Sequence, residues 1–315
     1  MYNGKLNIAS TAQMVLGQVG QVIVGKDETL MWVLAAILAK GHILLEDIPG
    51  VGKTSMALAF SKALGLDYRR IQFTPDVLPS DVTGYSVYQA NTMVYQPGAV
   101  LCNLLLADEL NRATSRAQAA LLEAMEEGQV TVDGVSHPIP KPFTVIATQN
   151  PAGAVGTLLL PDSQMDRFMV RLQIGYPDAK SEAAMVAQRQ DGDPLNKVNP
   201  VLTQSELLDL QDAVAQTYIK ENVVNYIVSL VRATREHKHI LQGASPRATL
   251  AVASMAKAVA RLDGRDYVTP ADVRYVFIPT VAHRIRLHPA EQDTGLTAEQ
   301  TLNQILSAVK APSVI

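Results

Sequence analysis

Residues 44–54 read Leu44-Leu45-Glu46-Asp47-Ile48-Pro49-Gly50-Val51-Gly52-Lys53-Thr54, the most informative segment of the chain for its fold class. The apolar run at 41–46 predicts a β-strand, and a helical segment opens after the stretch at Ser55. A glycine-containing turn between a strand and a helix that ends in Gly-Lys-Thr is the context of a phosphate-binding loop. Asp47 replaces the first glycine of the usual pattern, at the loop entry and away from the Gly-Lys-Thr end. We therefore predict that this loop holds nucleotide phosphates.

The residue types of the loop match separate physical tasks. Gly50 and Gly52 let the backbone turn so that its N–H groups point at phosphate oxygens, and the following helix adds the positive end of its dipole. The Lys53 ammonium is expected to reach the β- and γ-phosphates, and the Thr54 hydroxyl to ligate Mg²⁺. The residues expected to contact the nucleotide are Pro49, Gly50, Val51, Gly52, Lys53, Thr54 and Ser55.

Two further strand ends carry polar groups suited to phosphate chemistry. An apolar run ends in Asp108 and Glu109, and the run Phe-Thr-Val-Ile-Ala-Thr leads to Asn150. Paired acids at a strand end often only mark a turn. Following a phosphate-binding loop, however, they predict Asp108 in the Mg²⁺ shell and Glu109 orienting the attacking water. Asn150 is expected to sense the γ-phosphate. The acid pair predicts a hydrolase rather than a passive nucleotide binder.

Short apolar runs alternate with helical patterns in the first part of the chain, which predicts a parallel α/β sheet. The five expected strands lie at 41–46, 68–73, 100–108, 143–148 and 168–176. A polar, proline-containing segment at 192–200 reads as a linker. The helices expected beyond it lie at 203–216, 221–237, 246–262 and 270–286. We therefore predict a nucleotide-binding core at 1–190 and a helical domain at 191–315.

Composition narrows the function classes. The 315 residues carry a net charge of −3, which argues against a strong electrostatic hold on nucleic acid or an anionic membrane. No stretch approaches the roughly 20 apolar residues of a bilayer span. The N-terminal residues lack the apolar block of a secretory signal, and the single cysteine, Cys102, suits a reducing compartment. The expected location is the cytoplasm.

Taken in order, the motifs resemble those of AAA+ ATPases, and most closely the MoxR family. The stretches that carry the resemblance are LLEDIPGVGKT (44–54), LLLADELNRA (104–113), ALLEAMEEGQVTVDG (120–134), ATQNP (147–151), LPDSQMDRF (160–168) and SPRA (245–248). The resemblance covers nearly the whole chain. It implies a P-loop NTPase αβα core with strand order 5-1-4-3-2, followed by a small all-α lid, and hexameric rings that bind ATP at subunit interfaces.

The resemblance also implies roles for two arginines. Arg167 matches the arginine finger that projects into a neighbour's site, although the sequence alone leaves open that it is an ordinary arginine at a helix end. Arg247 matches the sensor-2 arginine that couples the lid to the nucleotide. Whether Arg247 serves its own subunit or a neighbour stays open.

Two insertions near 74–99 and 129–142 also fit the resemblance. Asp133-Gly134 in the second is a good hairpin turn. In such ATPases these insertions face the pore or a partner, and the alternative is that they are surface elaborations. Tyr85, Tyr88 and Tyr95 are the contacts to test.

The implied function is hydrolysis of ATP to ADP and phosphate to drive chaperone-like remodelling or maturation of partner proteins, with a von Willebrand factor A domain protein as the expected partner. An ATP-driven nucleic-acid translocase or loader is the alternative, but it predicts basic insertions. Residues 74–99 contain no Lys or Arg, and residues 129–142 contain only Lys141. A non-hydrolysing scaffold is disfavoured because Lys53, Asp108, Glu109 and Arg167 are all present.

Overall fold

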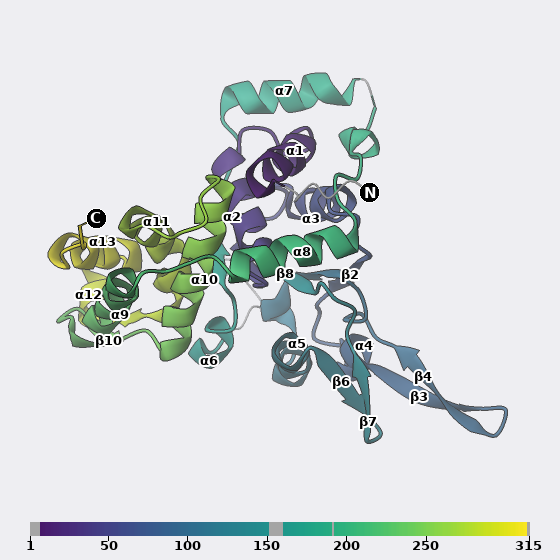
Figure 1. Ribbon diagram of the computed structural model, residues 1–315. Helices are drawn as coiled ribbons and strands as arrows, with labels where there is room; N and C mark the ends of the chain where they lie inside the picture. The colour runs from purple at the N-terminus through teal and green to yellow at the C-terminus, as the bar shows by residue number, and fades with distance from the viewer. Residues whose placement is uncertain (1–6, 151–159, 191, 314–315) are drawn as a thin grey trace.

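The computed structural model describes residues 7–150, 160–190 and 192–313 (Figure 1). Its centre is a sheet of five parallel strands in the order β2-β5-β8-β1-β9. The strands are β1 (Ile43–Glu46), β2 (Tyr68–Gln72), β5 (Leu104–Asp108), β8 (Thr144–Gln149) and β9 (Val170–Leu172). Numbered along the chain and read from the β9 edge, the order is 5-1-4-3-2, which confirms the predicted topology.

The sheet is buried on both faces because its strands are apolar at successive positions. In β5, Leu104 and Leu106 join one hydrophobic cluster, whereas Leu105 and Ala107 join another on the opposite face. This follows from the alternation of side chains along a strand. The first cluster includes residues of α1 (Ile8–Gly20), α2 (Asp27–Leu38) and α3 (Lys53–Ala63). The second includes residues of α5 (Ser115–Glu127). The core is therefore the predicted αβα sandwich.

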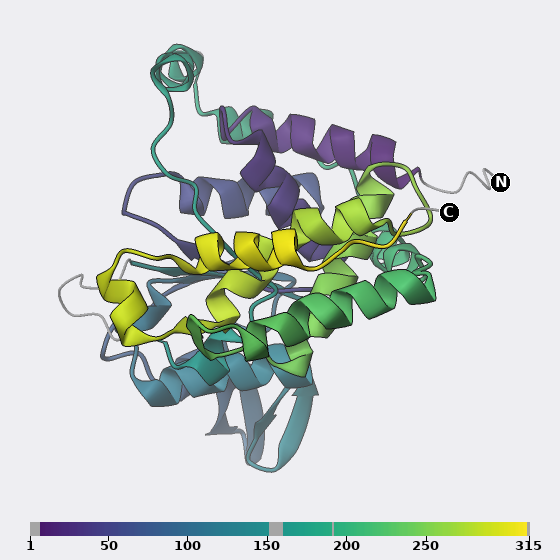
Figure 2. The same cartoon turned by 90° about the vertical axis from the view of Figure 1, so that its left-hand side faces the viewer.

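Beyond the sheet the chain is mainly helical. Helix α6 (Asp162–Met165) precedes β9. The elements that follow β9 are α7 (Ala179–Arg189), η2 (Pro194–Lys197), α8 (Gln204–Ala215), α9 (Glu221–Glu236), β10 (Ile240–Gln242), α10 (Pro246–Leu262), α11 (Pro270–Val281), η3 (Ala282–Arg284), β11 (Arg286–Leu287), α12 (Pro289–Asp293) and α13 (Ala298–Ala308). Figure 2 shows α13 and its neighbours lying in front of the sheet. Apolar residues of α8 to α11 and α13 belong to the same cluster as those of α1 to α3. The lid thus packs directly on one layer of the core, and the division near residue 190 stays a prediction.

Three elements are shorter than predicted. The expected strand 100–108 begins only at Leu104, because the chain turns just before it, where the Cys102 amide donates to the Val100 carbonyl at 2.8 Å. The expected strand 168–176 ends at Leu172, and the chain reaches Gly175 in a left-handed conformation. The expected helix 270–286 ends at Val281, after Pro279 has removed one backbone donor.

The two insertions form antiparallel hairpins that lie together (Figure 1). The first contains α4 (Pro79–Thr83), β3 (Gly84–Gln89) and β4 (Thr92–Pro97), and the second contains β6 (Gln129–Val132) and β7 (Val135–Pro138). Asp133 and Gly134 both have positive φ, as predicted for a two-residue turn. Tyr95 stacks on His137 with ring centroids 3.7 Å apart, so it joins the hairpins. Tyr85 and Tyr88 are 51% and 71% exposed and remain available to a partner.

Candidate functional site

The phosphate-binding loop has the backbone that its glycines predict. Gly50 has φ 90° and Gly52 has φ 95°, a region that residues with a side chain rarely adopt. A Cβ atom at Gly50 would meet nothing within 4 Å. These positions therefore favour glycine because of their positive φ angles, and not because a side chain would clash with neighbouring atoms. Helix α3 begins directly after Gly52, so its unpaired first amides face the loop.

The structure brings the predicted phosphate-site residues, except Val51, into one cavity of about 370 Å³. The loop residues come from the turn after β1, and the acids from the end of β5. The lining residues are Pro49, Gly50, Gly52, Lys53, Thr54, Ser55, Arg70, Gln72, Asp108, Glu109 and Asn150. Because the carboxyl ends of parallel strands meet at one edge of a sheet, residues far apart in sequence converge here.

A second and larger cavity of about 790 Å³ adjoins the first along the loop. The two share Pro49, Gly50, Gly52 and Ser55, and Val51 lines only the larger one. Its other walls include apolar side chains, among them Ile23, Ile174 and Leu195, and charged ones, among them Lys26, Glu182 and Arg189. A polar cavity beside a less polar one matches a nucleotide with its phosphates in the first and its base in the second.

Lys53 is buried, and its ammonium folds back on the loop. The Nζ atom donates to the carbonyl oxygens of Asp47 at 2.7 Å and Ile48 at 3.2 Å. Burial lowers the pKa of Lys53, whereas the negative charges of Asp47, Asp108 and Glu109 act in the opposite direction. The ammonium therefore lies where a phosphate can replace these two carbonyl contacts.

The two acids are held in different ways. Asp108 accepts from the Thr148 hydroxyl at 2.6 Å and from Arg70 at 2.7 Å. Glu109 has φ 54°, a left-handed conformation that costs a side-chain-bearing residue about 1–3 kcal/mol. Its amide donates to the same Thr148 hydroxyl at 2.8 Å, which fixes the turn. Because of this turn, the side chains of the consecutive residues Asp108 and Glu109 can point in different directions, one to hold a cation and the other to orient water.

The Glu109 carboxylate accepts three side-chain hydrogen bonds. The donors are Gln72 at 2.8 Å, Arg112 at 3.0 Å and Asn150 at 3.4 Å. Asn150 thus lies beside Glu109, and its role as a sensor of the γ-phosphate stays a prediction. Pro151, which ends its motif, lies outside the described residues. These three donors can orient the Glu109 carboxylate when a nucleotide enters the cavity.

Sequence reasoning missed Arg70 and Gln72. Both come from β2, whose Gln72 pairs in register with Asp108 of β5. Arg70 also donates to Gln72 at 2.7 Å. One signal in the sequence could have revealed them. The two residues are polar, lie two apart near the end of a strand predicted to neighbour the acidic strand, and therefore share one face of the sheet.

Asp47 has a structural task that explains the missing glycine. Its Oδ2 accepts from the amides of Ile174 at 2.5 Å and Gly175 at 2.9 Å, and its Oδ1 accepts from the Ile48 amide at 3.1 Å. Its side chain is buried. The carboxylate therefore connects the loop entry to the segment that follows β9. That segment lines the larger cavity with Ile174 and Gly175.

We expect Asp47→Gly to lower the free energy of unfolding by about 1–3 kcal/mol, since it leaves buried amides without an acceptor. Asp47→Asn should cost less, because it keeps one acceptor oxygen. Denaturant unfolding of the three proteins measures both values. An Asp47→Gly protein as stable as the parent would show that these hydrogen bonds contribute nothing.

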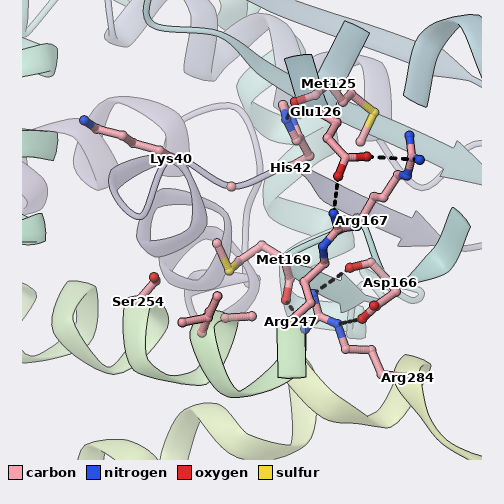
Figure 3. Close-up of a pocket in the computed structure, with 13 residues that line it drawn as sticks. Lys40, His42, Met125, Glu126, Asp166, Arg167, Met169, Arg247, Ser254 and Arg284 are labelled. Atoms are coloured by element: carbon pink, nitrogen blue, oxygen red, sulfur yellow. Dashed lines mark hydrogen bonds and ion pairs between the residues drawn. The ribbon is translucent and has the colours of Figure 1, made fainter. Parts of the chain in front are cut away.

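The structure places Arg167 and Arg247 away from these cavities. Both line a separate cavity of about 250 Å³, together with Glu126, Asp166 and Arg284 (Figure 3). Among the described residues, none lines both this cavity and the one that contains Lys53. In the single chain the two arginines are thus not brought together with the phosphate-site residues.

The donor set of the first cavity fits a magnesium ion held partly by a nucleotide. Thr54 and Asp108 line the same cavity and offer a hydroxyl and a carboxylate oxygen, the ligand types that Mg²⁺ prefers. The described ranges contain no group of three or more His, Cys, Asp or Glu that could hold a metal. In nucleotide sites Mg²⁺ usually takes one or two carboxylates plus substrate phosphates.

None of the helices described is long and apolar enough to cross a membrane.

Comparison with known proteins places the geometry in a family. Residues 42–170 match the ATPase family associated with various cellular activities (AAA), and residues 232–305 match an AAA lid domain. The protein YeaC of Bacillus subtilis, which is uncharacterized, is 46% identical over 93% of this chain and 92% of its own length. Chaperone MoxR1 of Mycobacterium tuberculosis is 36% identical over 96% of this chain and 83% of its own length.

A solved structure shows the same fold over the whole length. It is a crystal structure of a protein provisionally described as an ATPase, from Cytophaga hutchinsonii, with a TM-score of 0.91 and 36% identity. The match covers 98% of this chain and 97% of that one. From the nucleotide cavities, the helical lid and these relatives, the chain belongs to the MoxR family of AAA+ ATPases.

Proposed function

We propose that this chain hydrolyses ATP to ADP and phosphate, with Mg²⁺, and uses the energy to remodel or mature partner proteins. The observation that carries the proposal is the cavity in which the phosphate-binding loop, the acids of β5 and Asn150 meet. A passive nucleotide binder needs the loop but has no need of a carboxylate held beside the γ-phosphate position.

The residues divide the reaction between them. The loop amides, the α3 dipole and the Lys53 ammonium bind and neutralise the phosphates. Glu109 orients a water and accepts its proton during attack on the γ-phosphorus, and the bond to the β-phosphate oxygen breaks. Asn150 holds the Glu109 carboxylate and senses the γ-phosphate. When Mg²⁺ is bound, Thr54 and Asp108 hold it, and the ion neutralises charge on the phosphate oxygens.

Arg70 is a competitor for the Asp108 carboxylate. Its guanidinium lies 2.7 Å from Asp108 Oδ2, and its side chain is 45% exposed. A cation at Asp108 must therefore displace an ion pair that is partly open to solvent and weak for that reason. We expect Arg70 to turn away when the metal–nucleotide complex enters.

Arg167 and Arg247 are proposed to complete the site of an adjacent subunit in a homo-oligomeric ring, most simply a hexamer. What supports this is their position in a cavity separate from the phosphate site of their own chain. A guanidinium that reaches transferring phosphates stabilises their charge, an effect worth about 10³–10⁵ in rate in GTPases.

The client is proposed to be a protein rather than a nucleic acid. The relative named Chaperone MoxR1 favours this class, and a partner with a von Willebrand factor A domain is the finer proposal. The first hairpin exposes Tyr85 and Tyr88, while residues 74–99 lack Lys and Arg. Strand tracking along nucleic acid would need basic groups there. A cytoplasmic location stays a prediction.

Mixing two inactive variants tests the shared site. Arg167→Ala keeps an intact phosphate site but lacks the finger, whereas Lys53→Ala keeps the finger but binds ATP too weakly for efficient turnover. Each alone should hydrolyse ATP poorly, and an equimolar mixture should regain turnover, measured as phosphate release. A mixture no more active than its parts would contradict action of Arg167 on a neighbour.

A further inference from the structure

Arg167 and Arg247 share a contact that the mechanism above does not use, the carboxylate of Glu126 (Figure 3). Glu126 is the penultimate residue of α5, directly before the second hairpin. Its Oε2 lies 3.0 Å from Arg167 Nη2, and its Oε1 accepts from Arg247 Nη2. Arg167 Nη1 also donates to the Leu122 carbonyl at 2.7 Å, one turn earlier in α5. One carboxylate therefore joins arginines that come from two other elements.

The backbone beside Arg167 is fixed independently of Glu126. Asp166 accepts from the Ser245 hydroxyl at 2.8 Å and from Arg284 Nε at 2.8 Å. Arg284 is buried, and it donates to the Phe168 carbonyl at 2.7 Å. Ser245 caps the helix on which Arg247 lies. Residues 166–168 and the start of α10 are thus already held together, and Glu126 acts on the guanidinium ends alone.

The free ends of the two arginines need a counter-charge to stay side by side. Two guanidiniums repel each other, and a carboxylate between them offsets that repulsion. A guanidinium has five N–H donors, and the Glu126 contacts use one nitrogen of each arginine, so donors remain for a phosphate. The pair also keeps an excess of one positive charge over Glu126.

The cluster faces solvent. The side chains of Arg167, Arg247 and Glu126 are 31%, 42% and 38% exposed. A surface that presents two partly paired guanidiniums is complementary to the charged phosphates of a bound nucleotide.

We propose that Glu126 is a positioning residue that holds Arg167 and Arg247 as one unit on the face that a second copy of this chain approaches. Both guanidiniums then reach the nucleotide of that copy together. This inference rests on the proposed function, because it requires Arg167 to act on a neighbouring subunit.

The test places Glu126→Gln in one subunit at a time. A donor carrying Lys53→Ala supplies arginines but has no working phosphate site, and an acceptor carrying Arg167→Ala has the site but no finger. Their mixture defines the reference turnover. Glu126→Gln is then added either to the donor or to the acceptor, and phosphate release is measured for each mixture. Glu127→Gln in the donor is the matched control, since Glu127 is the adjacent exposed acid on α5.

We expect Glu126→Gln in the donor to lower the reference turnover by about 10-fold or more, because a misplacement of about 1 Å can cost about 100-fold. The same substitution in the acceptor, and Glu127→Gln in the donor, should leave the turnover unchanged. A structural role would not depend on which subunit carries the change.

Three results would overturn the inference. Equal losses in both arms would mean that Glu126 only supports the fold or acts within its own subunit. An unchanged or higher turnover in the donor arm would mean that the carboxylate does not position the arginines or restrains them. A reference mixture without turnover, before any change at Glu126, would refute the shared site itself and the inference with it.

Discussion

Glu109→Gln is expected to lower ATP turnover by about 100-fold or more, because a positioned general base contributes about 10²–10⁴ in rate. The amide keeps the size of the side chain and can still accept from Gln72, which lies 2.8 Å from the carboxylate. It can no longer take a proton from water. Binding of ATP should therefore persist while hydrolysis nearly stops.

Turnover and equilibrium binding of a fluorescent ATP analogue separate these two effects. Glu123→Gln, at an exposed position of α5, is the matched control and should behave as the parent. Normal turnover by the Glu109→Gln protein would remove Glu109 from the role of base.

Lys53→Ala is expected to weaken ATP binding by about 30-fold or more, since removing one partner of a buried charge pair costs about 2–5 kcal/mol. The ammonium is buried at the start of α3 and lines the cavity of the phosphate-binding loop. The loop amides alone cannot replace its full charge.

Isothermal titration with ATP and Mg²⁺ measures this loss. Lys310→Ala, at an exposed position near the C-terminal end, serves as the control. Retention of the parental affinity by the Lys53→Ala protein would contradict the assignment of this cavity to the phosphates.

The parts of the molecule that local sequence determines were predictable. The glycines of the loop, the strand that precedes it and the turn at Asp133-Gly134 follow from backbone preferences of neighbouring residues. The order of the five strands followed from the family resemblance and is confirmed. Helix α2 was not predicted, and eight of its twelve residues are buried, so it lacks the polar face that marks an amphipathic helix.

The parts that depend on distant contacts were not predictable. In the sequence, Asp47 is only a departure from the glycine of the usual loop pattern. In the structure, its carboxylate accepts hydrogen bonds from amides more than a hundred residues away. Arg70 enters the site through the pairing of β2 with β5, and Glu126 meets its arginines through the packing of three elements. In each case the tertiary structure brings together side chains that are far apart in sequence, and a local motif carries no information about such contacts.

We propose that residues 50–54 hold a triphosphate whose γ-phosphate lies beside Glu109. The decisive experiment is a crystal structure with Mg²⁺ and a non-hydrolysable ATP analogue. We predict phosphates in the cavity of the loop, the Lys53 ammonium moved from the Asp47 and Ile48 carbonyls onto phosphate oxygens, and Mg²⁺ beside Thr54 and Asp108. A crystal that contains the analogue elsewhere, with Lys53 still on those carbonyls and Arg70 still on Asp108, would refute this placement of the triphosphate.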